Sequence, residues 1–185
     1  MMPFHCPLST ARPAIFFDRD GVLNVDVNYL YKTEDFQWIA GAKEAIKYYN
    51  DQGYLVFVVT NQSGVARGYY SEADVHNLHK WMQQELAAAG ARIDAFYHCP
   101  HHVQGSVVEY SLDCGCRKPA PGLLLQAMEE WPVNKDQSLL IGDKPSDIEA
   151  AQAAGIKGYL FAGGNLLEFV TKISSPKIPS REGCP

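Results

Sequence analysis

The chain has 185 residues and a mass of 20.5 kDa, enough for one domain, and a hydrophobic content of 46% excludes wholesale disorder. Its formal net charge of −5 differs from the positive charge that is typical of nucleic-acid-binding proteins. Because it has neither a signal peptide nor an apolar stretch of about 20 residues, we expect a cytoplasmic protein that binds neither nucleic acid nor a membrane.

Short apolar runs of strand length recur along the chain. Strands that are buried on both faces of a parallel sheet have near-continuous hydrophobic runs of this kind. The predicted strands cover residues 14–17, 54–59, 93–97, 138–141 and 158–161.

Segments with helical periodicity separate these runs. Ala42, Ile46 and Tyr49, for example, recur at the spacing of one helix face. Ser71 is placed to cap a second helix, with Asp74 three residues further on. The predicted helices cover residues 42–52, 72–89, 121–131 and 147–154.

Alternating strands and helices predict a three-layer α/β/α, doubly wound parallel sheet with right-handed crossovers. We expect a single domain over residues 14–172, between proline-containing tails at 1–13 and 173–185. A separate lid domain does not fit, because residues 21–40 are predicted to be a loop and 69–90 a single helix. In such a sheet, ligands bind beyond the carboxyl ends of the strands.

Acidic residues follow two of the predicted strands. Asp18 and Asp20 come after the first strand, and in an extended segment they share a face while Arg19 points away. Two carboxylates so close repel each other unless a cation neutralises them. Asp143 follows the strand at 138–141, and three carboxylates at neighbouring strand ends suit Mg²⁺. Alone, Asp-x-Asp-Gly is also a common turn.

A second group of residues suits a phosphoryl ligand. The strand at 54–59 is followed by Thr60-Asn61-Gln62-Ser63-Gly64, which offers a hydroxyl and backbone amides. Arg117 adds a planar guanidinium with several hydrogen-bond donors, and Lys118 adds a compact positive charge. Taken alone, the Thr60 segment could simply begin a loop, and Arg117 and Lys118 could be a solvent-exposed cationic pair. Together with the carboxylates, however, the two segments predict a phosphate-binding site.

These segments resemble the signatures of the haloacid-dehalogenase-like phosphatases, at Asp18-Arg19-Asp20-Gly21, Thr60-Asn61-Gln62, Lys118 and Gly142-Asp143-Lys144-Pro145-Ser146-Asp147. The resemblance implies the fold of that family without a cap. It also implies that Asp18 is a nucleophile that forms an aspartyl-phosphate, with Asp20 as general acid and then base. Thr60 and Lys118 would stabilise the phosphoryl oxygens. The Mg²⁺ ligands implied are Asp18, Asp20 and Asp143.

Cysteine and histidine gather in one loop, residues 99–116. Three thiolates and one imidazole make a closed tetrahedral set for a structural Zn²⁺, here Cys99, His101, Cys114 and Cys116. A Cys114–Cys116 disulfide and unliganded thiols are the alternatives. His98 and His102 flank the loop motif, and the resemblance favours His101 as the ligand. Because the loop leads directly into Arg117, zinc would help to position that residue and the next.

A closer resemblance covers residues 15–161. Similarity to D-glycero-D-manno-heptose-1,7-bisphosphate 7-phosphatases lies in Val25-Asp26-Val27-Asn28-Tyr29, residues 60–68, residues 99–105 and residues 114–119. That family acts in the cytoplasm, in making the heptose of lipopolysaccharide or S-layer glycans. The resemblance implies a small sugar bisphosphate as substrate, and we expect a monomer. The implied substrate contacts are Asp26, Val27, Asn28, Tyr29, Asn61, Gln62, Ser63, Arg117 and Lys144.

Val22 and Leu23 depart from the family pattern, in which Thr-Ile or Thr-Leu is more usual. Three other functions share parts of the motif set. A histidinol-phosphate phosphatase has the same aspartates and a similar zinc loop, but the Pro-His-His-x-Gln-Gly insert favours the sugar enzyme. A polynucleotide 3′-phosphatase is disfavoured because the chain has a net negative charge, whereas binding to a phosphate backbone favours positive charge. A non-catalytic phosphosugar-binding module is disfavoured because the catalytic aspartates and Lys118 are all present.

Overall fold

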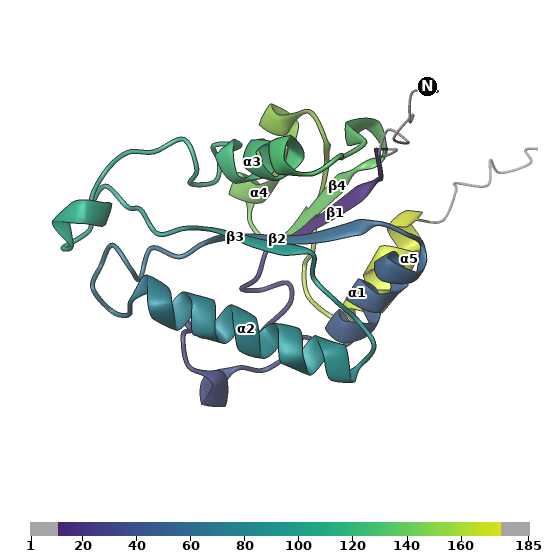
Figure 1. The fold of residues 1–185 in the computed structure, drawn as a ribbon, viewed down its shortest axis with the longest axis horizontal. Coiled ribbons are helices and arrows are strands. Elements are labelled where there is room, and N and C mark those ends of the chain that lie inside the picture. Colours follow the sequence, from purple (N-terminus) through teal and green to yellow (C-terminus); the bar gives the residue numbers. More distant parts are fainter. Residues whose placement is uncertain (1–10, 175–185) are drawn as a thin grey trace, which may run out of the picture.

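Five parallel strands form one sheet in the computed structural model, which describes residues 11–174 (Figure 1). They are β1 (Ala14–Phe17), β2 (Leu55–Asn61), β3 (Ala95–Cys99), β4 (Leu139–Gly142) and β5 (Lys157–Leu160). The order across the sheet is β3-β2-β1-β4-β5. The register pairs Phe16 of β1 with Phe57 of β2 and with Leu140 of β4. The predicted parallel sheet is therefore confirmed.

Helices cover both faces of the sheet. They are α1 (Ala42–Asp51), α2 (Glu72–Ala88), α3 (Gly122–Glu130), α4 (Pro145–Ala154) and α5 (Leu166–Ser174), with 3-10 turns at Thr33–Asp35, Val108–Tyr110 and Lys135–Gln137. In Figure 1, α3 and α4 lie on one side of the strands, and α1, α2 and α5 lie on the other. This is the predicted three-layer, doubly wound architecture.

The two cores follow from alternation along β1. Ile15 and Phe17 pack into the core beneath α1, α2 and α5, while Ala14 and Phe16 pack into the core beneath α3 and α4. All four are fully buried, because the strand is covered on both faces. An uninterrupted apolar run is therefore the pattern that this central strand requires.

Local signals set the ends of the helices. The predicted cap of α2 is confirmed, since the Ser71 side chain accepts from the Asp74 backbone and Asp74 accepts from Ser71 in return. At the end of α4, Gly155 has a φ of 76°, a left-handed conformation that glycine adopts without strain. α5 was not predicted; it buries Leu166 and Val170 and packs against α1.

Parts of the predicted tails fall within the described residues. α5 continues two residues past the boundary predicted at 172, and the Arg12 guanidinium donates to the Gly53 carbonyl at 2.7 Å. The rest of both tails lies outside the described residues. No helix in residues 11–174 combines the length and apolar character needed to cross a bilayer.

The order of the strands in the sheet determines where the ligand site lies. The chain runs outward from β1 through β2 to β3 and then returns to add β4 on the other side of β1. The carboxyl ends of β1 and β4 therefore flank the point where the order reverses, which is where such sheets bind ligands. Residues 18–41 connect β1 to α1 with only a 3-10 turn between them, and the described part of the chain contains no separate lid domain.

Candidate active site

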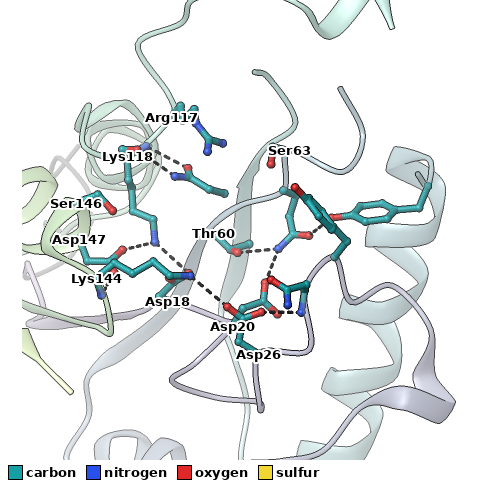
Figure 2. A pocket seen from close by; sticks show the side chains of 15 residues that line it. Asp18, Asp20, Asp26, Thr60, Ser63, Arg117, Lys118, Lys144, Ser146 and Asp147 are labelled. Atoms are coloured by element: carbon teal, nitrogen blue, oxygen red, sulfur yellow. Dashed lines mark hydrogen bonds and ion pairs between the residues drawn. The ribbon is translucent and has the colours of Figure 1, made fainter. Parts of the chain in front are cut away.

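A cavity of about 420 Å³ opens at the carboxyl ends of the strands (Figure 2). Most of the predicted site residues line it: Asp18, Asp20, Asp26, Asn28, Tyr29, Thr60, Asn61, Gln62, Ser63, Arg117, Lys118 and Lys144. Tyr70, Ser146 and Asp147 line it as well, and they were not among the predicted site residues. Val27 lines a separate, neighbouring cavity.

Asp18 and Lys118 form an ion pair at the centre of this cavity. The Lys118 Nζ lies 3.0 Å from Asp18 Oδ1 and donates to the Val59 carbonyl at 2.8 Å. Burial raises the pKa of Asp18 to about 6, although Lys118 acts in the opposite direction. Burial also opposes the charge of Lys118, but the carboxylates of Asp18 and Asp147 outweigh it and raise the pKa of Lys118. Lys118 is therefore a buried ammonium beside the predicted nucleophile.

Asp147 orients this lysine from the first turn of α4. Its Oδ1 lies 2.5 Å from Lys118 Nζ, and its Oδ2 accepts from the Lys144 backbone N–H at 3.0 Å. The second contact caps the start of α4, where acidic side chains are favoured. The sequence signal for this role was the position of Asp147 in the first turn of a predicted helix, three residues after Lys144.

A group of carboxylates suits a hard cation. Oxygen atoms of Asp18, Asp143 and Asp147 all lie within 4.8 Å of one another. Asp143 Oδ1 is buried and has no hydrogen-bond partner among residues 11–174, and burial raises the pKa of this carboxyl. Such an oxygen lacks the partner that a cation would supply, so these residues fit Mg²⁺. The Asp20 carboxylate, predicted as a third ligand, is not in this group.

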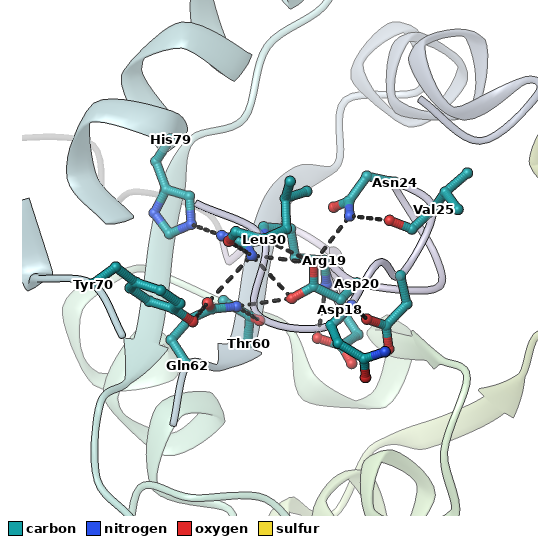
Figure 3. Close-up of polar contacts among 12 residues, drawn as sticks. Asp18, Arg19, Asp20, Asn24, Val25, Leu30, Thr60, Gln62, Tyr70 and His79 are labelled. Carbon is teal, nitrogen blue, oxygen red and sulfur yellow. Dashed lines mark hydrogen bonds and ion pairs between the residues drawn. The ribbon is translucent and has the colours of Figure 1, made fainter. Parts of the chain in front are cut away.

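Asp20 instead pairs with Arg19 (Figure 3). Arg19 was predicted to point away, but its side chain folds back into the protein, is fully buried and lies 3.0 Å from Asp20 Oδ2. Asn24 and Gln62 each donate to Asp20 at 2.9 Å. Burial alone raises the pKa of Asp20, but Arg19 and these two donors outweigh it and lower the pKa below its usual value.

Gln62 connects Asp20 to the end of β2. Its Nε2 donates to Thr60 Oγ1 at 2.9 Å, so the Thr60 hydroxyl keeps its own hydrogen to donate into the cavity. Its Oε1 accepts from Arg19 at 3.2 Å and from the Tyr70 hydroxyl at 2.7 Å. Arg19 and Tyr70 are thus parts of the site that the sequence did not reveal, because no motif indicated that their side chains turn toward Gln62.

The loop after β1 forms one wall of the cavity. The Asp26 carboxylate accepts from the Asn28 backbone N–H at 3.0 Å and lies 3.3 Å from Lys144 Nζ. Asn28 and Tyr29 have φ values of 60° and 55°, a left-handed conformation that is strained in a tyrosine. The Tyr29 ring packs edge-on against Tyr69 at 4.7 Å. These contacts hold the strained loop toward the cavity.

The predicted zinc ligands also converge. One atom each from Cys99, His101, Cys114 and Cys116 lies within 4.8 Å of the others, which fits a closed tetrahedral zinc site. The Cys114 and Cys116 sulfurs are 3.3 Å apart, far from the disulfide bond length of about 2.05 Å. The flanking His98 pairs with Glu72 at 3.1 Å, and His102 faces Arg67, so neither belongs to the cluster.

The zinc loop reaches the cavity through two different anchors. Arg117 Nη1 donates to the carbonyl of His101 at 3.4 Å, which connects it to a predicted zinc ligand. Lys118 is held from β2 instead, because the Asn61 side chain donates to its carbonyl at 3.0 Å and accepts from its N–H at 3.1 Å. Arg117 therefore depends on the zinc loop more directly than Lys118 does.

Comparison with known proteins agrees with this geometry. A family model described as HAD-hydrolase-like matches residues 115–172. The D-glycero-beta-D-manno-heptose-1,7-bisphosphate 7-phosphatase of Rhodopseudomonas palustris is 49% identical over 162 residues, covering 88% of this chain and 90% of the relative. The D-glycero-alpha-D-manno-heptose-1,7-bisphosphate 7-phosphatase of Photorhabdus laumondii is 46% identical over 141 residues, covering 76% and 77%.

A solved structure shows the same similarity. The crystal structure of D,D-heptose 1,7-bisphosphate phosphatase from B. bronchiseptica, complexed with magnesium and phosphate, has a TM-score of 0.72 to this chain. The two are 31% identical, and the match covers 89% of both chains. The fold, the site and these relatives together show that the chain is a phosphatase and belongs to the D-glycero-D-manno-heptose-1,7-bisphosphate 7-phosphatase family of haloacid-dehalogenase-like phosphatases.

Proposed function

We propose that this protein removes the 7-phosphate of D-glycero-D-manno-heptose 1,7-bisphosphate, in the cytoplasm and as a monomer. The observation that carries the chemistry is the Asp18–Lys118 ion pair of 3.0 Å beside the carboxylates of Asp143 and Asp147. The substrate is inferred from relatives that are 46–49% identical and named for it.

In the first step, an Asp18 carboxylate oxygen attacks the phosphorus and the bond from phosphorus to the sugar oxygen breaks. Asp20, in its protonated form, gives its proton to the departing alkoxide. In the free protein the pKa of Asp20 is lowered by Arg19, Asn24 and Gln62, which outweigh burial. A bound phosphate brings negative charge close to Asp20 and favours its protonated form.

In the second step, Asp20 acts as a base. Its carboxylate accepts a proton from a water molecule whose oxygen attacks the phosphorus, and the bond from phosphorus to Asp18 breaks. Inorganic phosphate leaves, Asp18 is again a carboxylate, and Asp20 is again protonated for the next cycle. Two displacements of this kind replace one difficult hydrolysis.

Charge on the phosphoryl oxygens needs compensation in both steps. Lys118 supplies a buried ammonium, and the Thr60 hydroxyl supplies a donor whose hydrogen is free. Asp18 and Asp143 would hold Mg²⁺, with Asp147 beside them, and the ion would neutralise further charge on the same oxygens. Asp20 acts as a proton donor and acceptor, since its carboxylate lies outside the cation group.

Zinc would have a purely structural role. Cys99, His101, Cys114 and Cys116 provide a complete tetrahedral set, which leaves no position for water or substrate. The zinc would fix the loop that presents Arg117 to the cavity.

Substrate recognition falls to the loops around the cavity, since the described chain has no cap. Asp26 and Asn28 suit sugar hydroxyls, and Arg117 suits an anionic group of the substrate. Tyr29, Asn61, Gln62, Ser63 and Lys144 line the same space. Val27 does not, so its side chain is not proposed as a contact.

A substrate panel tests this function. Phosphate release is measured with Mg²⁺ on both anomers of the heptose 1,7-bisphosphate, on histidinol phosphate and on a 3′-phosphorylated oligonucleotide. We expect the highest kcat/KM on the heptose bisphosphate, with one phosphate released and heptose 1-phosphate as product. A higher kcat/KM on histidinol phosphate would reassign the substrate, and absence of turnover with all of them would favour a binding module.

A further inference from the structure

A buried tyrosine lines the active-site cavity but has no part in the two steps described above. Tyr70 lies two residues before the start of α2 and is only 8% exposed. Burial raises the pKa of Tyr70 to about 12, although the Arg19 guanidinium acts in the opposite direction. The phenol therefore stays neutral near neutral pH and keeps a hydrogen to donate.

That hydrogen is directed at the side chain of Gln62. The Tyr70 hydroxyl donates to Gln62 Oε1 at 2.7 Å (Figure 3). It makes the shorter of two bonds to this oxygen, since the Arg19 Nη2 that also donates to it lies 3.2 Å away. Gln62 is itself buried, so the carbonyl end of its amide depends on these two donors.

The other end of the same amide faces two reacting groups of the proposed mechanism. Gln62 Nε2 donates to Asp20 Oδ2 and to Thr60 Oγ1, each at 2.9 Å. A side-chain amide has two N–H donors, and both are used here. A shift of the Gln62 side chain would therefore release the proposed acid and base and the phosphoryl-binding hydroxyl at the same time.

The bond from Tyr70 gains importance when Asp20 changes its charge. As a carboxylate, Asp20 accepts strongly from the Gln62 amide and helps to hold it. As a protonated acid, Asp20 is a weaker acceptor and holds the amide less firmly. Tyr70 stays protonated throughout, so its bond to Gln62 persists in both steps and keeps the contact with Thr60.

The ring of Tyr70 is fixed from two sides. It stacks on the ring of Tyr31 in the loop after β1, with centroids 5.2 Å apart and planes inclined by 22°. In the turn after β2, a side chain at residue 64 would overlap the Tyr70 ring, and Gly64 permits the close approach. These contacts leave the hydroxyl little freedom to turn away from Gln62.

We propose that Tyr70 is a positioning residue for the phosphatase reaction, whose hydroxyl holds Gln62 so that one amide group serves both Asp20 and Thr60. The inference rests on the proposed function, because it takes Asp20 as acid and base and Thr60 as a donor to the phosphoryl oxygens. Tyr70 acts only through Gln62. Removing its hydroxyl should therefore slow turnover without weakening substrate binding.

The test combines Tyr70→Phe, Gln62→Ala and the double variant in a double-mutant cycle. kcat and KM are measured with Mg²⁺ on heptose 1,7-bisphosphate and on an aryl phosphate with a good leaving group. The phenylalanine keeps the ring that stacks on Tyr31 and removes only the hydroxyl. Tyr48→Phe is the control, because Tyr48 belongs to α1 and does not line the cavity. Urea unfolding measures the stability of each variant.

We expect Tyr70→Phe to lower kcat on the heptose bisphosphate by about 5- to 10-fold and to change KM by less than about twofold. The aryl phosphate should lose about threefold in kcat, because it needs the Thr60 donor but little protonation by Asp20. In the Gln62→Ala background the same substitution should lower kcat by less than about twofold. Tyr48→Phe should keep the kcat of the natural chain.

Two results would overturn the positioning role: an unchanged kcat in Tyr70→Phe, whatever its stability, or equal fold losses with and without Gln62. Failure of the natural chain to hydrolyse the heptose bisphosphate would overturn the proposed function alone, because the aryl phosphate still tests Tyr70.

Discussion

The fully buried guanidinium of Arg19 contacts both carboxylate oxygens of Asp20, at 3.1 Å to Oδ1 and 3.0 Å to Oδ2 (Figure 3). The nitrogen that makes both of these contacts, Arg19 Nη2, also donates to the Leu30 carbonyl at 2.9 Å. The other terminal nitrogen, Nη1, lies 3.5 Å from His79 Nε2. Arg19 therefore connects the proposed acid and base to the loop that forms one wall of the cavity and to α2. Together with Asn24 and Gln62, Arg19 holds the Asp20 carboxyl in place.

Replacing Arg19 should impair proton transfer more than phosphoryl binding. We expect Arg19→Gln to lower kcat on the heptose bisphosphate by about 100-fold, the order expected for a misplaced general acid. An aryl phosphate with a good leaving group needs little protonation, so its kcat should fall much less. Steady-state rates on the two substrates, with Mg²⁺ saturating, measure this difference.

Arg19→Lys provides the comparison for this variant, because it retains the charge but not the forked geometry. It should show a smaller version of the same selective loss. A loss that is equal on both substrates, with native circular dichroism, would contradict a role in positioning Asp20.

The Lys118–Asp147 pair should contribute to stability as well as to the position of Lys118. Asp147→Asn keeps an oxygen that can accept from the Lys144 N–H but removes the charge beside Lys118, so we expect a loss of about 3 kcal/mol in unfolding free energy. Asp147→Ala also removes the cap of α4 and should lose about 1 kcal/mol more. Urea unfolding measures both values. Equal stability of the two variants would contradict the capping contact.

Removing zinc should affect substrate binding more than turnover. Arg117 depends on the His101 carbonyl, whereas Lys118 is held by Asn61. We expect verified zinc loss, with Mg²⁺ restored, to raise KM for the bisphosphate by roughly tenfold and to change kcat less. Unchanged kinetics after zinc loss would show that the loop keeps its shape without the metal.

His79 should make the fold sensitive to acid. Burial, together with Arg19 and the neighbouring His98 and His76, lowers the pKa of His79 well below 6.5. Below pH 6.5 the unfolded chain therefore takes up a proton that the folded chain does not, and stability falls as the pH falls toward the folded pKa.

Urea unfolding at pH 7.5 and pH 5.5 tests this effect with His79→Gln, which has no ionisable ring. Between these pH values the natural chain should lose about 1.4 kcal/mol more unfolding free energy than the variant. The same pH dependence in both proteins would show that folding does not lower the pKa of His79.

Hydrophobic patterning was sufficient to predict the sheet but not the ends of its strands. β2 was predicted to end at residue 59, yet Thr60 and Asn61 continue it by pairing with His98 and Cys99 of β3. Polar residues extend a strand here because a neighbouring strand satisfies their backbone, and hydropathy does not report that. α5 likewise gains its buried face only from packing against α1.

The site could be predicted wherever residue types at strand ends identify the chemistry. The residues lining the cavity include most of those predicted, because parallel strands bring their carboxyl ends to one edge. Side-chain direction could not be predicted in the same way. Arg19 folds back onto Asp20 because tertiary contacts override the alternation expected of an extended segment. Asp147 reaches Lys118 from the first turn of α4, a contact between two segments that are separate in the sequence.

Direct trapping of the covalent intermediate tests the central claim, that Asp18 carries the phosphoryl group. The enzyme is mixed with substrate and Mg²⁺, quenched within one turnover and reduced with borohydride, which converts an aspartyl-phosphate into homoserine. Peptide mass spectrometry should find homoserine at position 18 in the natural chain and none in Asp18→Asn, which should also have no turnover. Homoserine at another aspartate, or full activity of Asp18→Asn, would contradict the account.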